Sequence, residues 1–119
     1  MAFLLNSGNG SFSVGATLTL TGGFVELGDV DNDGDIDLLR VLNQGVAADL
    51  LVSLNDGAGT FGVANAFPIT RNPNSILMVD VTGDGFLDAI TTHSPGSGQS
   101  DSNVIVNNGD GTFAAAVVQ

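Results

Sequence analysis

The chain has 119 residues, enough for one ordinary domain. Its formal net charge is −11, because 13 acidic residues stand against two basic ones, Arg40 and Arg71. Phosphate binding needs clustered lysine and arginine, so this charge argues against nucleic acid as a partner. The chain has no cysteine, and no apolar run approaches the roughly 20 residues of a membrane span. Seventeen glycines and a scarcity of lysine and glutamate favour strands and turns over helices.

The N-terminal segment, residues 1–22, predicts a β-hairpin. Two strand-like stretches, 2–6 and 12–21, flank the turn Asn6-Ser7-Gly8-Asn9-Gly10-Ser11-Phe12. Glycine at alternate positions supplies the positive φ that such a loop needs. The turn also contains the one sequon for N-glycosylation, at Asn9. The first residues lack the basic region of a signal peptide, which leaves two interpretations: a removed leader or a segment excised from a larger protein.

An acidic stretch follows, Asp29-Val30-Asp31-Asn32-Asp33-Gly34-Asp35-Ile36-Asp37. Five carboxylates on alternate residues repel one another unless a cation neutralises them. Ca²⁺ takes six to eight oxygen ligands, and the glycine at position 6 permits the sharp turn of a calcium loop. The predicted ligands are Asp29, Asp31 and Asp33 at positions 1, 3 and 5, Asp35 through its backbone carbonyl at position 7, and Asp37 at position 9.

The acidic motif recurs 51 residues later, over residues 80–88. An EF-hand is excluded for both loops, because it needs a glutamate at position 12, where Arg40 and Thr91 stand. The alternative for both loops is a solvated acidic turn. Two bound Ca²⁺ ions would bring the net charge from −11 to −7. The predicted ligands of the second site are Asp80, Thr82, Asp84, Phe86 through its carbonyl, and Asp88.

The turn motif Asn-x-Gly-x-Gly-Ser/Thr-Phe also recurs, over residues 55–61 and 107–113. A fixed period of about fifty residues indicates a propeller, a solenoid or an array. The recurring Phe12, Phe61 and Phe113 are predicted to anchor the core. Near-continuous apolar runs such as residues 38–42 and 76–79 fit sheets that are covered on both faces, as in stacked blades.

We therefore predict an all-β fold of β-propeller blades: an N-terminal half-blade over residues 1–22 and two four-stranded blades over 23–71 and 72–119. The expected strands are 24–29, 37–43, 49–55 and 60–70 in the first blade, and 75–80, 88–92, 102–107 and 112–119 in the second.

The paired motifs resemble the FG-GAP/VCBS repeats of integrin-α-type β-propellers. In that family each blade carries D-x-D/N-x-D-G-x-x-D between its first two strands and an N-x-G-x-G-x-F hairpin later. Phe61-Gly62 matches the FG signature, whereas Phe12-Ser13 and Phe113-Ala114 keep only the phenylalanine. The resemblance implies Ca²⁺ at both acidic loops. Family propellers close with about seven blades, so two and a half blades cannot close within one chain.

The terminal strands, 17–21 and 113–119, are near-neutral and lack the charges that normally block edge pairing. The expected partners are therefore other copies of the chain, in a ring or a filament, or further repeats of a longer chain. The surplus half-blade favours strand exchange with a neighbour.

No catalytic residue is predicted. His93 is the only histidine, and it falls in the Gly/Ser/Pro-rich stretch 91–101 with no nucleophile at useful spacing. The predicted function is an extracellular, calcium-stabilised, non-enzymatic structural or adhesion module, since weak calcium loops fill at the millimolar Ca²⁺ found outside cells. One alternative is a lectin-like propeller with glycans as partners, weakened by the lack of Trp and Tyr. The other is an excised segment of a larger secreted propeller protein.

Overall fold

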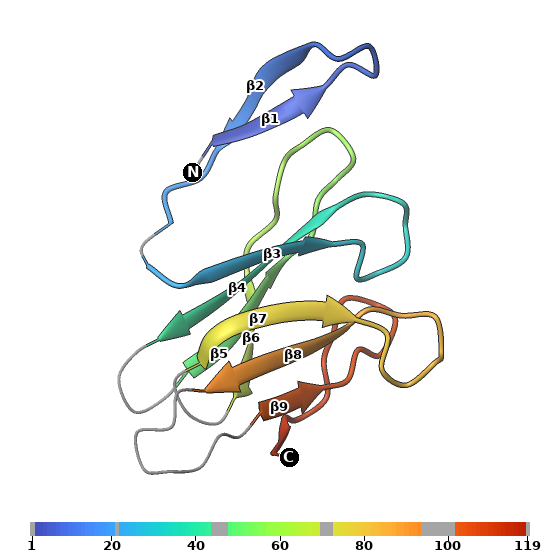
Figure 1. The fold of residues 1–119 in the computed structure, drawn as a ribbon. Helices are drawn as coiled ribbons and strands as arrows, with labels where there is room; N and C mark the ends of the chain where they lie inside the picture. The colour runs from blue at the N-terminus through green and yellow to red at the C-terminus, as the bar shows by residue number, and fades with distance from the viewer. Residues whose placement is uncertain (1, 21, 44–47, 70–72, 94–101, 119) are drawn as a thin grey trace.

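The computed structural model describes residues 2–20, 22–43, 48–69, 73–93 and 102–118. All regular elements in these ranges are strands, arranged in three antiparallel sheets, which confirms the predicted all-β class (Figure 1). No helix within the described ranges is long and apolar enough to cross a membrane. The ten strands are β1 (Ala2–Asn6), β2 (Phe12–Thr17), β3 (Phe24–Gly28), β4 (Asp37–Asn43), β5 (Ala48–Ser53), β6 (Asn65–Ile69), β7 (Pro73–Val79), β8 (Asp88–His93), β9 (Ser102–Ile105) and β10 (Val117–Val118).

Each four-stranded sheet follows the chain from strand to neighbouring strand. The orders are β3-β4-β5-β6 and β7-β8-β9-β10, and the hairpin β1-β2 forms a sheet of its own. Strand β4 pairs with β3 from Leu38 opposite Leu27, and with β5 from Leu38 opposite Ser53. One face of β4 is buried and the other is buried or half-buried over residues 37–42, which accounts for the apolar run that the sequence shows here.

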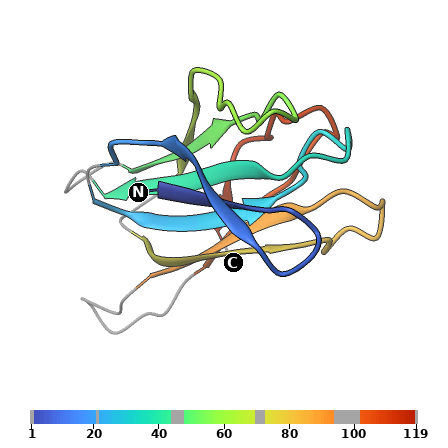
Figure 2. The ribbon, with the colours of Figure 1, turned by 90° about the horizontal axis from the view of Figure 1, so that it is seen from above.

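The two four-stranded sheets share one hydrophobic core, to which the described residues of the hairpin contribute nothing. Strand β3 of the first sheet lies beside β7 of the second, as both views of the ribbon show (Figures 1 and 2). Phe67 and Phe113 meet edge to face across the junction, with ring centroids 5.6 Å apart. The buried cluster consists of Val30, Leu39, Val41, Ala48, Leu50, Val52, Ile69, Ile76, Ala89, Ile105 and Phe113.

The fourth strand of each sheet begins later than predicted. After each glycine-rich turn the chain makes only a single bridge, Asn55 with Phe61 and Asn107 with Phe113, and rejoins the sheet at β6 or β10. The predicted strands 60–70 and 112–119 are therefore too long, and their last residues lie outside the described ranges.

The prediction that three phenylalanines anchor the core holds only in part. Phe113 is buried, and Phe61 is half-buried and stacked on Phe3 with ring centroids 4.6 Å apart. The prediction is wrong for Phe12, which is 62% exposed. Phe12 lies in the hairpin, which forms a two-stranded sheet of its own and contributes no described residue to the core cluster.

Candidate metal centre

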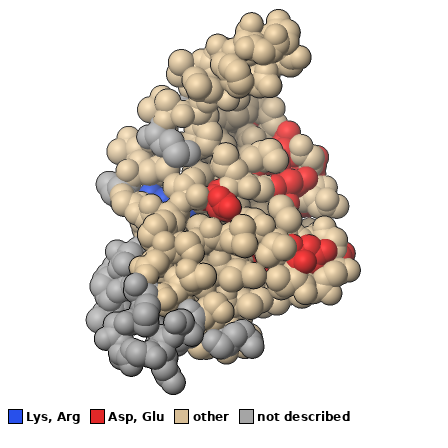
Figure 3. Space-filling view, in the orientation of Figure 1, with Lys and Arg blue, Asp and Glu red and all other residues tan. Residues whose placement is uncertain are grey.

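The acidic loops and the glycine-rich turns lie along the same edge of the molecule (Figures 1 and 2). The loop 29–36 connects β3 with β4, and the loop 80–87 connects β7 with β8 in the same way. Acidic side chains gather over this edge in the space-filling view (Figure 3). The repeat therefore places like charges from both blades on one side of the fold, as the matching positions of the two motifs require.

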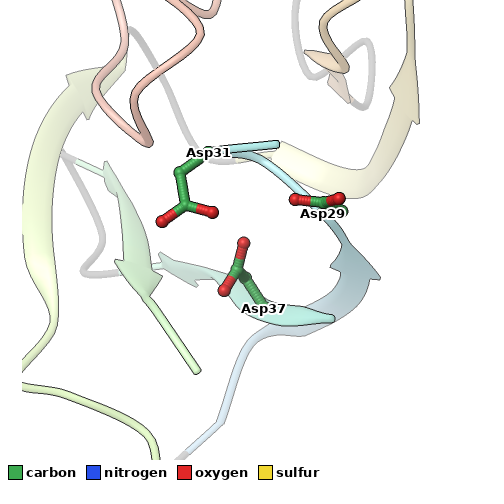
Figure 4. A group of neighbouring side chains, drawn as sticks. All are labelled: Asp29, Asp31 and Asp37. Atoms are coloured by element: carbon green, nitrogen blue, oxygen red, sulfur yellow. The ribbon is translucent and has the colours of Figure 1, made fainter. Parts of the chain in front are cut away.

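The first loop brings three carboxylates together. One oxygen from each of Asp29, Asp31 and Asp37 lies within 4.8 Å of the other two, so the three groups surround a common space (Figure 4). Asp29 and Asp31 come from the loop, whereas Asp37 begins β4 and is fully buried. Oxygen atoms from several carboxylates around one point are the ligands that Ca²⁺ prefers.

Two oxygens of this group are buried without a partner. Among the described residues, neither Asp29 Oδ1 nor Asp31 Oδ1 accepts a hydrogen bond. Burial raises the pKa of the Asp31 carboxyl, and the neighbouring charges of Asp37, Asp33 and Asp29 raise it further. Because a buried, unpaired carboxylate is unfavourable, these residues fit a bound cation that would satisfy both oxygens.

Asp37 has a second role that does not depend on a metal. Its Oδ2 accepts a hydrogen bond from the Val30 N–H (2.9 Å), and its Oδ1 accepts one from the Asn55 N–H (2.8 Å). The side chain thereby joins the acidic loop to the glycine-rich turn of the same blade. Asp88 repeats the arrangement in the second blade, with the N–H groups of Val81 (3.0 Å) and Asn107 (2.9 Å). The sequence predicted both residues only as metal ligands.

The remaining predicted ligands of the first loop stand outside the group of three. Asp33 is exposed, and its Oδ1 accepts a hydrogen bond from the Asp35 N–H (2.9 Å). The Asp35 side chain lies over Gly57, where a Cβ atom would come within 2.5 Å of Asp35 Oδ2. Phe86 occupies the same place over Gly109 in the second blade, 2.6 Å from such an atom. The positive φ of Gly57 and Gly109 already favours glycine in these turns, and the side chain at position 7 adds a close approach above it.

In the second loop, both oxygens of the first aspartate accept hydrogen bonds from the loop itself. Asp80 accepts hydrogen bonds from the N–H groups of Gly83 (2.7 Å) and Gly85 (2.9 Å), and from the Thr82 hydroxyl (3.4 Å). Asp84 Oδ1 accepts one from the Phe86 N–H (3.0 Å). Within the described ranges, residues 80–88 bring no group of three carboxylates together as the first loop does. The predicted second site stays a prediction, and the buried unpaired oxygens of the first loop have no counterpart among its described residues.

Low pH should destabilise the protein, because it protonates carboxylates of the turns and of the second acidic loop that accept hydrogen bonds. Backbone N–H groups hold the pKa of Asp56 and Asp80 below the ordinary value, and the Thr112 hydroxyl and N–H do the same for Asp110. A lowered folded-state pKa contributes stability that is complete above the unfolded value of about 3.9 and is lost as pH falls through the folded value. In chelator, the melting temperature of Asp110→Asn should therefore fall less below pH 4 than that of the parent, because asparagine keeps the acceptor without titrating. An equal fall in both proteins would contradict this role.

A contact between the two blades was missed by the sequence analysis. Asn107 Nδ2 donates to the Val30 carbonyl of the first acidic loop (2.8 Å) and to the Leu87 carbonyl of its own blade (3.1 Å). The Gly111 N–H donates to the same Val30 oxygen (3.1 Å). The sequence signal for this contact was the asparagine that begins each turn motif. Its spacing alone does not show which loop the side chain reaches.

His93 is placed differently from its prediction. It lies at the end of β8 and not in a loop, and its Nε2 is 2.9 Å from Asn103 Nδ2. The side chain is buried among the described residues. This is the position of a core histidine with an amide partner.

A family model described as an FG-GAP-like repeat matches residues 29–91. The match begins at the first acidic loop, passes through the second, and covers more than half of the sequence. The chain belongs to the FG-GAP-like repeat family. FG-GAP repeats are β-propeller blades, so the two four-stranded sheets are blades of this kind. We call β3–β6 blade 1 and β7–β10 blade 2.

The FG-GAP assignment also gives a general picture of function. Repeats of this family are generally structural or binding modules rather than catalysts, and they are typical of extracellular proteins. Searches of curated proteins and of solved structures gave no match. The predicted domain boundaries after residues 22 and 71 stay predictions.

Proposed function

We propose that this chain is a calcium-stabilised, non-enzymatic structural or adhesion module that acts outside cells and associates with copies of itself. The observation that carries the calcium part is the pair of buried oxygens without partners, Asp29 Oδ1 and Asp31 Oδ1, beside the buried carboxylate of Asp37. FG-GAP repeats often bind Ca²⁺, which supports the same ion here.

In the first site, Asp29, Asp31 and Asp37 would hold the ion, with Asp33 and the Asp35 carbonyl as the further ligands that the motif supplies. Ca²⁺ would contribute positive charge where the loop concentrates negative charge. In the second site, Asp80, Thr82, Asp84, Asp88 and the Phe86 carbonyl would play these parts. Because Asp80 is already satisfied by N–H groups, we infer that the second loop depends less on calcium.

Self-association is supported by the apolar surface at both ends of the stack of sheets. Leu4, Phe12 and Val14 of the hairpin are all more than 60% exposed. Leu77 and Val81 are about half exposed on blade 2. Apolar patches of this kind mark interaction sites. Glycosylation at Asn9, whose side chain lies in an exposed turn, and glycan binding stay predictions.

The calcium proposal predicts opposite effects of Asp31→Asn with and without the ion. In chelator the substitution should raise the melting temperature by a few degrees, because it removes one of the charges that repel one another around the site. At saturating Ca²⁺ the variant should be less stable than the parent. An ion at 100 times its dissociation constant stabilises the parent by about 2.7 kcal/mol, and the variant loses part of this.

Calorimetric Ca²⁺ titration and thermal unfolding in Ca²⁺ and in chelator would test the prediction. Thr82→Asp is the matched variant, since it places at the equivalent position of blade 2 the carboxylate that blade 1 has. It should lower stability in chelator and strengthen Ca²⁺ binding. Equal destabilisation by Asp31→Asn in both conditions would count against a metal centre in the first loop.

A further inference from the structure

The junction between the blades is made by a turn of one blade and an acidic loop of the other. Val30 lies at this junction and is 1% exposed, and its carbonyl accepts hydrogen bonds from Asn107 Nδ2 and the Gly111 N–H. Val81 holds the same position in the loop of blade 2 and is 46% exposed. Among the described residues, nothing donates to the Val81 carbonyl. The chain therefore carries one loop of this type without its turn.

The surface around Val81 matches the one that blade 1 uses against blade 2. At the positions equivalent to Val79 and Val81, blade 1 has Gly28 and Val30. A Cβ atom at Gly28 would lie 3.0 Å from the Leu87 side chain, so this face of blade 1 is closely packed against blade 2. The corresponding surface of blade 2, formed by Leu77, Val79 and Val81, is exposed. We refer to these three residues as the open face.

Two turns also lack the acidic loop of a preceding blade: the turn 55–61, whose Gly59 lies against Leu5 of the hairpin, and the turn 6–12. In the turn 6–12, the Ser7 N–H donates to the Ser11 carbonyl (2.9 Å) and the Gly8 N–H to Asn6 Oδ1 (2.9 Å). The turn at 107–113 has the same two bonds, at 2.9 Å each, and both turns have positive φ at their two glycines. The turn 6–12 is thus already formed. Its Asn6 Nδ2, equivalent to that of Asn107, has no partner among the described residues.

The hairpin stands beside blade 1 as blade 1 stands beside blade 2. A Cβ atom at Gly59 would lie 3.5 Å from Leu5 Cδ2, and one at Gly111 would lie 2.9 Å from Leu54 Cδ2. Leu5 and Leu54 are equivalent, since each precedes the asparagine of its turn. The hairpin therefore occupies the place of the last two strands of a preceding blade. In that place, its turn is directed toward an acidic loop that the same chain does not supply.

We propose that the turn 6–12 of one copy docks on the open face of a second copy, where Asn6 Nδ2 and the Gly10 N–H donate to the Val81 carbonyl. The proposal rests on the self-association proposed above and names its contact. Residues 1–22 contain no charged side chain, so this turn approaches the acidic loop without repulsion. The turn 55–61 already lies against the hairpin, since a Cβ atom at Gly59 would be 3.5 Å from Leu5 Cδ2. Docking would also bury Phe12. The contact is head to tail, and it propagates into a filament or closes into a ring.

Sedimentation velocity of the full chain across a wide concentration range, in Ca²⁺, tests the contact. Asn6→Asp keeps the acceptor for the Gly8 N–H but loses the donor, and it should weaken association by about tenfold or more. Asn9→Asp adds the same charge to the same turn and keeps its own acceptor for the Ser11 N–H, so it should change association much less. Val81→Lys should abolish association, whereas Val63→Lys, at a valine that is 95% exposed, should not.

A mixture of Asn6→Asp and Val81→Lys gives the sharpest result. At a concentration at which wild-type chains associate and the weakened Asn6→Asp does not, each variant alone should be monomeric, but the pair retains one intact turn and one intact open face. The mixture should therefore form a species of twice the 12.0 kDa chain mass and nothing larger. Wild-type chains that stay monomeric at every concentration would overturn the proposed self-association itself. Wild-type chains that associate, with both variants unaffected or the mixture still monomeric, would overturn only this contact.

Discussion

Asp37→Ala should destabilise the protein by about 2–6 kcal/mol in chelator, and by more in Ca²⁺. The Asp37 carboxylate accepts the N–H groups of Val30 and Asn55 at a fully buried position. Removing one partner of a buried hydrogen bond costs about 1–3 kcal/mol for each group left unsatisfied, and alanine leaves two. The loss of a metal ligand adds to this only when calcium is present. Urea unfolding in both conditions measures the two contributions separately.

Asp33→Ala is the matched control, because Asp33 belongs to the same loop but is exposed and accepts only a local bond from the Asp35 N–H. It should weaken the protein in Ca²⁺ and change it little in chelator. If Asp37→Ala behaved like Asp33→Ala, with its whole effect confined to the calcium-loaded protein, the bridge between loop and turn would contribute nothing to the fold.

Asn107→Asp should be the most damaging conservative change in blade 2. The Asn107 amide donates to the Val30 and Leu87 carbonyls, and its side chain is 2% exposed. An aspartate of the same shape would place a carboxylate against two carbonyl oxygens at a buried site, close to Asp88. We expect a loss of about 3–5 kcal/mol, the range measured when a buried charge is left uncompensated. Thermal unfolding followed by circular dichroism would show it.

The neighbouring Asn108→Asp is the control for charge. Asn108 is exposed, and its side chain reaches only the Thr112 hydroxyl of the same turn (2.9 Å). Asn108→Asp should lower the free energy of unfolding by less than about 1 kcal/mol. Similar losses of stability in the two variants would show that the added negative charge is responsible and not the lost donor. The bond from Asn107 to the Val30 carbonyl would then not be what joins the blades.

Much of the fold could be predicted because the signals are local and repeated. Glycine at alternate turn positions and aspartate at alternate loop positions determine the backbone over a few residues, so the recurrence of both motifs gave the all-β class and the blade-like repeat. The trio Asp29, Asp31 and Asp37 was among the predicted ligands for the same reason.

What the sequence did not predict depends on contacts between distant residues. The bond from Asn107 to the Val30 carbonyl spans 77 positions and involves a backbone atom, which leaves no trace in side-chain type. The bridging role of Asp37 was hidden because a metal ligand and a hydrogen-bond acceptor have the same side chain. Phe12 was predicted to be buried from its repeat position, but burial depends on whether a further sheet is present.

The bond between Val30 and the turn of blade 2 has a consequence for how such chains change in length. Each junction uses the loop of one repeat and the turn of the next, so every internal repeat is both a donor and an acceptor. Duplication or deletion of a whole period of about fifty residues leaves the same unmatched groups, which are the loop of the last repeat and the turns of the half-blade and of the first blade. A change by any other length would leave a buried carbonyl or amide inside the stack without its hydrogen-bond partner. Growth of such a gene by intact tandem units is therefore the route that this geometry tolerates.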